Sequence, residues 1–213
     1  MGLIIGQSSG GGGVQREPIP ADLYPAVFCG VVDIGTQDTP NGEKHQVRIV
    51  WEIPELRQTG EIDGEQYDRP RNIAKKYTFS FHEKASLFKH LCSARGKQFT
   101  PEELKAFDLF SIIGKPCQLQ VAQFTTEDGK TIAYVENVVK FKGKDAPQME
   151  TETPLQFALS DWDGKAKPET LPDWLWETIR KSPEYAAKAA TANDVAAVAA
   201  AFGGDVVDDD CPF

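Results

Sequence analysis

The chain has 213 residues, a net charge of −9 and 40% hydrophobic residues, enough for one domain of ordinary size with extensions. Its four cysteines, at positions 29, 92, 117 and 211, lie too far apart for a zinc motif, and a core of this size needs no disulfide framework. The apolar run Leu3-Ile4-Ile5 is too short for a signal peptide, so we expect neither secretion nor membrane insertion, and a cytoplasmic location.

Three strands are predicted in the first part of the chain. Residues 1–17 are rich in Gly and Ser and are expected to be disordered. Structure then begins, and β-branched, aromatic and alternating patterns indicate strands at 24–34, 45–53 and 72–81. Gly30 indicates a bulge in the first strand. The polar residues 55–69 predict a loop between the second and third strands.

A helical insert and two further strands follow. Residues 82–95 place apolar side chains on one helical face, with Gly96 as the C-terminal stop. Thr100-Pro101-Glu102-Glu103 is typical of a second helix start. Strands at 115–124 and 131–141 flank a hairpin turn. This order predicts a mainly β domain over 18–144, a five-stranded OB barrel with its helix between the third and fourth strands.

The last third of the chain has a different character. Residues 145–202 predict a polar linker followed by short helices that begin near Leu171 and Ser182, with Phe157 and Trp162 as isolated apolar points. Alanine favours the second of these helices, although isolated Ala-rich helices are marginal in water. Residues 203–213 are expected to stay solvated, because their aspartates repel one another and they have little apolar surface to bury.

The distribution of charge leaves the body free to carry a local basic face, and the stretch Arg69–Lys97 is rich in basic residues. Residues 1–144 hold 18 basic and 18 acidic side chains, so the acidic excess belongs to residues 145–213, with 5 basic and 14 acidic. Single-stranded nucleic acid binding needs cations that follow the phosphates and aromatic rings on which bases stack. The second and third strands present such a surface in an OB barrel. The candidate DNA-binding residues are Arg48, Trp51, Arg69, Arg71, Lys75, Lys76 and Tyr77.

The aromatic candidates also have a structural interpretation. Alternation places Trp51, Phe79 and Phe81 on apolar faces of the strands, which favours a role in the core. Tyr77 is open to either role, because its hydroxyl tolerates a wet edge. The basic side chains could equally form a solvated face.

Nothing in the sequence indicates catalysis. There is no P-loop, HExxH or GxSxG motif, and the three histidines, His45, His82 and His90, form no recognisable catalytic set. The acid pair Glu102-Glu103 fits the start of a helix better than a metal site. We therefore expect a protein that is not an enzyme and needs no cofactor.

The final residues, GGDVVDDDCPF, combine four aspartates with a closing Pro-Phe. A basic groove would take the aspartates, and an apolar pocket beside a cation would take the phenylalanine. This ending resembles the acidic tip of bacterial and phage single-stranded DNA-binding proteins, with Cys211 as a mild departure. The resemblance implies a partner-binding tip formed by Asp208, Asp209, Asp210, Cys211, Pro212 and Phe213.

The resemblance implies a protein that coats single-stranded DNA during phage replication or recombination in the bacterial cytoplasm. The tip would recruit replication or recombination proteins and compete with DNA for a cationic groove. A homo-oligomer is compatible with the sequence, which leaves the number of subunits open. The alternatives are an acidic DNA mimic or adaptor that binds a DNA-processing enzyme but not DNA, and a nuclease subunit, which would need an acid cluster.

Overall fold

The computed structural model describes residues 17–62 and 64–202 and is mainly β. Its six-stranded sheet has the order β3-β2-β1-β4-β5, with β6 parallel to β1 and all other pairs antiparallel. The strands are β1 (Asp22–Thr39), β2 (Gly42–Ile62), β3 (Glu65–Thr78), β4 (Pro116–Thr125), β5 (Thr131–Lys140) and β6 (Leu155–Phe157). The edges β3 and β5 contact each other but form no ladder within the described residues.

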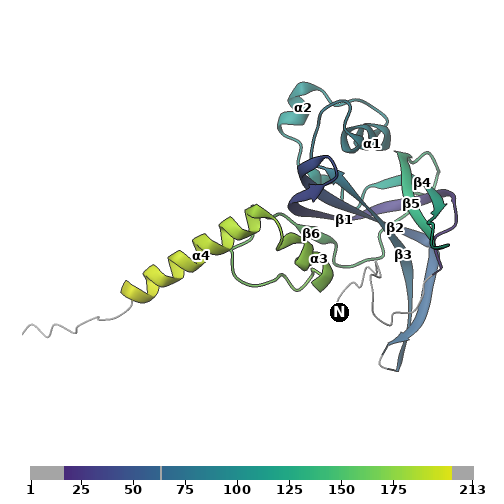
Figure 1. Cartoon of the computed structure of the whole chain (residues 1–213). Coiled ribbons are helices and arrows are strands. Elements are labelled where there is room, and N and C mark those ends of the chain that lie inside the picture. Colours follow the sequence, from purple (N-terminus) through teal and green to yellow (C-terminus); the bar gives the residue numbers. More distant parts are fainter. Residues whose placement is uncertain (1–16, 63, 203–213) are drawn as a thin grey trace, which may run out of the picture.

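Helices lie at two places in the chain (Figure 1). The predicted insert between β3 and β4 is confirmed and contains α1 (Ser86–Arg95), α2 (Pro101–Lys105) and the 3-10 helix η1 (Leu109–Ile112). Gly96 ends α1 in the left-handed conformation, and Thr100 and Glu103 form a capping box at α2. The C-terminal helices are α3 (Asp173–Ile179) and α4 (Pro183–Phe202).

The loop predicted at 55–69 is wrong, because β2 and β3 continue through it as a paired hairpin arm. The ladder resumes after an irregularity, with Arg57 opposite Pro70, and continues to Ile62 opposite Glu65. Figure 1 shows this arm projecting from the rest of the sheet. Because it lies outside the body, both of its faces are largely polar, and no apolar alternation marks it in the sequence.

The sheet has apolar clusters on both faces. The inner cluster lies on one face and includes Trp51, Tyr77, Leu119 and residues of α1. The outer cluster packs residues 155–179 against the other face of β1 and β2. The linker predicted between residue 145 and the helix near Leu171 is therefore wrong where the chain joins this cluster, and its apolar points are buried: Phe157 and Trp162 are 7% and 6% exposed.

Gly30 allows β6 to approach β1. The pairing of β1 with β2 shifts between Phe28 and Gly30, which confirms the predicted bulge. A Cβ atom at Gly30 would lie only 2.9 Å from the Leu155 Cβ, so a larger residue would push β6 away. β6 is the first element of the outer layer, the residues from 155 onward that cover the outer face of the sheet.

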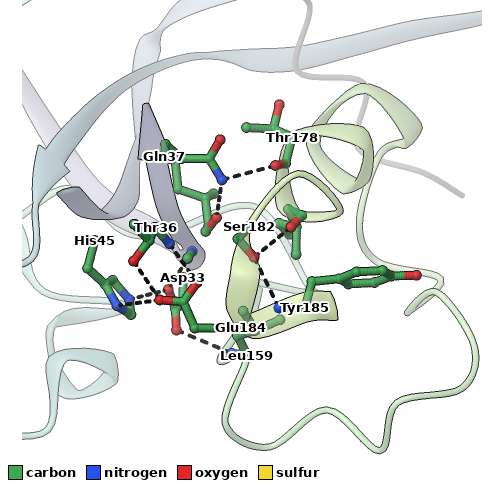
Figure 2. Close-up of polar contacts among 12 residues, drawn as sticks. Asp33, Thr36, Gln37, His45, Leu159, Thr178, Ser182, Glu184 and Tyr185 are labelled. Atoms are coloured by element: carbon green, nitrogen blue, oxygen red, sulfur yellow. Dashed lines mark hydrogen bonds and ion pairs between the residues drawn. The ribbon is translucent and has the colours of Figure 1, made fainter. Parts of the chain in front are cut away.

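Besides the β6–β1 pairing, two glutamate carboxylates fasten the C-terminal part of the chain to the sheet, each at its own point. The buried carboxylate of Glu52 accepts bonds from the backbone N–H groups of Glu150 and Thr151 and from the Thr151 hydroxyl. At the other point, Figure 2 shows the carboxylate of Glu184 directed at Thr36, whose N–H and hydroxyl donate to it at 2.9 and 2.5 Å. Burial raises the pKa of Glu184, but these bonds outweigh burial and lower it overall.

Candidate nucleic-acid interface

The seven predicted DNA-binding residues do not form one surface. They lie on β2 and β3, but adjacent residues of a strand point to opposite faces. Trp51, Lys75 and Tyr77 lie on the inner face, because their neighbours there belong to the inner cluster. Arg48 and Lys76 lie opposite each other on the outer face.

Trp51 and Tyr77 are core residues, so their predicted role as stacking platforms does not fit the structure. They are 1% and 2% exposed, and their rings pack edge to face at 6.4 Å. The Tyr77 hydroxyl is 2.8 Å from His90 Nδ1, which joins β3 to α1. Burial, and secondarily the charge of Lys75, lowers the pKa of His90 to about 4, so the imidazole is neutral and can accept this bond.

The inner-face cations are already engaged within the protein. Lys75 Nζ donates to the backbone carbonyl of Val135 at 2.7 Å, across the unpaired seam between β3 and β5. Burial lowers the pKa of Lys75. Arg71 donates to the carbonyl of Glu17. In the arm, the Arg69 guanidinium stacks on the Tyr67 ring at 4.6 Å. Lys75 therefore has a structural role that the sequence pattern did not indicate.

A basic groove lies elsewhere, between the helical insert and the end of β5. Its volume is about 1480 Å³, and four lysines line it against one acid, Glu83: Lys89, Lys97, Lys140 and Lys142. Lys97 also contacts Glu103 at 3.3 Å. Lys89 and Lys97 belong to the basic stretch seen in the sequence, whereas Lys140 and Lys142 join them only through folding. Gly96 allows this, since a Cβ there would lie 2.7 Å from Lys140 Cδ.

The same groove has aromatic walls. Phe81, Phe88 and Phe99 line it, and the Phe88 and Phe99 rings lie 6.0 Å apart. The Arg95 guanidinium covers Phe99 at 4.0 Å from the ring centroid and pairs with Glu103. Phe81 is partly exposed, while Phe88 and Phe99 are mostly buried. The groove thus combines ammonium groups with one partly exposed aromatic side chain, Phe81, and single-stranded nucleic acids bind surfaces that combine cations with accessible rings.

Two exposed aromatic groups lie outside the groove. Phe124 and Tyr134, 49% and 39% exposed, pack at 5.8 Å on the β4–β5 hairpin. Phe79 is 43% exposed beside His45 and Phe81, so the core role favoured for Phe79 is wrong. The alternating sequence pattern extends to Phe79, but β3 ends at Thr78. Phe79 therefore lies beyond the covered part of the inner face.

No family model and no curated protein matches the chain. Within residues 17–62 and 64–202, no three His, Cys, Asp or Glu side chains are arranged to hold a metal ion. No helix in the same part of the chain is both long and apolar enough to cross a membrane. The predicted partner-binding tip, Asp208–Phe213, lies outside the described residues.

Proposed function

We propose that the protein is an OB-fold single-stranded DNA-binding protein that recruits partner proteins through residues 208–213. The strand order β3-β2-β1-β4-β5, the contact between β3 and β5, and the helical insert after β3 support the OB assignment. Its setting in phage replication or recombination rests on the resemblance of the acidic tip alone.

The basic groove is the observation that carries the DNA-binding proposal. Four lysines face one acid over a volume of about 1480 Å³, which suits a polyanion. Phe81, the partly exposed aromatic side chain of the wall, is available to contact the face of an unpaired base, whereas a duplex keeps those faces stacked inside. We therefore expect single strands to bind more tightly than duplex, with little preference among bases.

The acidic tip would act on the same groove. Like DNA, the C-terminal segment that ends in the tip is a polyanion, because it carries Asp205, Asp208, Asp209 and Asp210. DNA that occupies the groove would release the tip, and the released tip would be available to replication or recombination proteins. The groove and the tip together link DNA occupancy to partner recruitment.

The test compares two double variants of equal charge change. Lys89→Ala with Lys142→Ala removes two groove lysines, and Lys165→Ala with Lys181→Ala removes two exposed lysines outside the groove. Fluorescence anisotropy with a labelled oligo-dT would measure affinity against salt. The groove variant should weaken binding and reduce the slope of log K against log salt by about 1.4, from about 0.7 per phosphate contact. The control variant should keep the wild-type slope.

Two results would contradict the proposal. Equal affinity of the wild type for single-stranded and duplex DNA would remove the role of the aromatic wall. Absence of binding to either form, together with capture of a DNA-processing enzyme, would favour the adaptor hypothesis instead.

A further inference from the structure

A pair of cations lies on the outer face of the sheet, away from the basic groove. Arg48 on β2 and Lys76 on β3 are directly opposite each other in the ladder. Cross-strand neighbours of this kind have Cβ atoms about 5 Å apart, so the two positive side chains share one site. Neither residue lines the basic groove.

Arg48 is buried without a polar partner. It is 4% exposed, and its Nε atom is buried and makes no hydrogen bond. Its guanidinium lies 4.9 Å from the ring centroid of Trp174, the second residue of α3. Among the described residues, no acid forms an ion pair with Arg48. Buried charges in proteins are normally paired, so this cation lacks the group that would neutralise it.

Lys76 adds a second positive charge next to the unpaired charge of Arg48. Its side chain is exposed, and its pKa is lowered first by partial burial and then by the neighbouring charge of Arg48. Across the part of the chain that the structure describes, no ion pair includes Lys76. Two adjacent positive charges therefore repel each other with no anion between them.

Trp174 adds a third unused donor. Its indole Nε1–H is buried and makes no hydrogen bond, although its ring covers the Arg48 guanidinium. Indole nitrogen can only donate, so it suits an acceptor oxygen. Arg48 therefore has a cation opposite it in the ladder, Lys76, and an aromatic ring 4.9 Å away whose own donor is unpaired, Trp174. Among the described residues, no acceptor is bonded to these donors on β2, β3 and α3.

We propose that Arg48, Lys76 and Trp174 form a binding site for a phosphate group. A phosphate carries negative charge and several acceptor oxygens that point in different directions, which matches donors arriving from three elements. A carboxylate has two oxygens in one plane and would satisfy fewer of these donors. Free phosphate and the phosphodiester of a nucleic acid offer the same chemistry, so the site does not depend on the single-stranded DNA proposal.

The experiment uses Lys76→Gln and Trp174→Phe, with Lys165→Gln as the control. Lys76 is exposed, so its variant should fold, and Phe keeps an aromatic ring over Arg48 while it removes the N–H. Titration calorimetry with inorganic phosphate, and anisotropy with unphosphorylated oligo-dT, would be run on the full chain at constant ionic strength. Loss of one charge-assisted hydrogen bond should weaken binding by about tenfold or more.

The two arms separate the sources of the phosphate. Phosphate binding that weakens in both test variants, but not in the control, supports a site for free phosphate. Inorganic phosphate does not bind in the other case, and oligo-dT affinity falls about tenfold in both test variants but not in the control. That result would show that the site binds the phosphodiester of a nucleic acid.

The proposal is overturned if the wild type does not bind phosphate and the variants bind oligo-dT as well as the control does. It is also overturned if phosphate is inert and both variants lose affinity only for a peptide of residues 205–213, since the site would then recognise carboxylates. A wild type that binds phosphate but not oligo-dT contradicts the DNA-binding proposal and leaves the phosphate site standing.

Discussion

Tyr77 and His90 couple the stability of the fold to pH. His90 accepts a bond from the Tyr77 hydroxyl in the folded protein, where its pKa is about 4 instead of 6.5. In the unfolded chain the imidazole takes up a proton as pH falls below about 6.5, while the folded protein resists protonation down to about 4. This group therefore stabilises the fold fully above pH 6.5, and its contribution decreases between pH 6.5 and 4.

We predict that wild-type stability falls over this pH range by about 1–2 kcal/mol on account of His90, a figure reduced because the ring is partly solvated. His90→Gln should show a flatter profile, since Gln does not titrate. His82→Gln, at an exposed histidine outside this pair, is the matched control and should behave as wild type. Urea unfolding at pH 7, 5.5 and 4.5 would measure this, and an identical profile for His90→Gln and wild type would contradict the assignment.

The charged residues at the end of the hairpin arm are all acidic. Residues 60–67 carry Glu61, Asp63 and Glu65 and no basic residue. We predict that replacing Gly60–Tyr67 by Asn-Gly, which favours a tight two-residue hairpin, leaves the body folded and does not weaken single-stranded DNA binding. The readouts are the thermal unfolding midpoint and oligo-dT affinity. A weaker affinity would place part of the DNA on the arm.

The elements differ in how far their sequences predict them. The five main strands and the helical insert could be located because turns and changes of period bound them. The arm could not be predicted from alternation, although Asp63-Gly64 is a favoured hairpin pair and was the available signal. The outer layer was missed because its apolar residues are scattered among polar ones. The continuous apolar run of β1 was a sign that both of its faces are covered.

The candidate site was predicted only in part, for a related reason. Strand alternation identified Trp51 as a core candidate, but it could not show that Tyr77 is buried beneath α1. The basic stretch Arg69–Lys97 of the sequence includes the groove residues Lys89 and Lys97. Lys140 and Lys142 lie far from it in the sequence and reach the groove only through the packing of β5 against α1. A surface assembled from distant segments leaves no local pattern in the chain.

At the scale of the whole molecule, the acidic tip is predicted to modulate the body. Deleting Asp208–Phe213 should tighten oligo-dT binding at low salt, because three aspartates no longer compete for the basic groove. The gain should fade towards 0.1 M salt, where the Debye length is about 10 Å. Anisotropy titrations at several salt concentrations would measure it, and equal affinities at low salt would contradict competition.

Phe213→Ala separates the two roles of the tip. It keeps every aspartate, so oligo-dT affinity should stay at the wild-type value while capture of replication or recombination proteins is lost. A pull-down with wild-type and variant protein would measure this. Full capture by Phe213→Ala would show that the tip acts through charge alone.

β1 contributes residues to both apolar clusters, so the outer layer cannot be separated from the sheet. A polypeptide ending at Lys144 would keep every main strand but uncover Val32, Ile34 and Val50, which are now fully buried by the layer. An exposed apolar face of this kind promotes aggregation. The boundary that the sequence suggests between a domain and a linker would therefore yield an insoluble fragment, and the shortest soluble form of the protein should extend past Ile179.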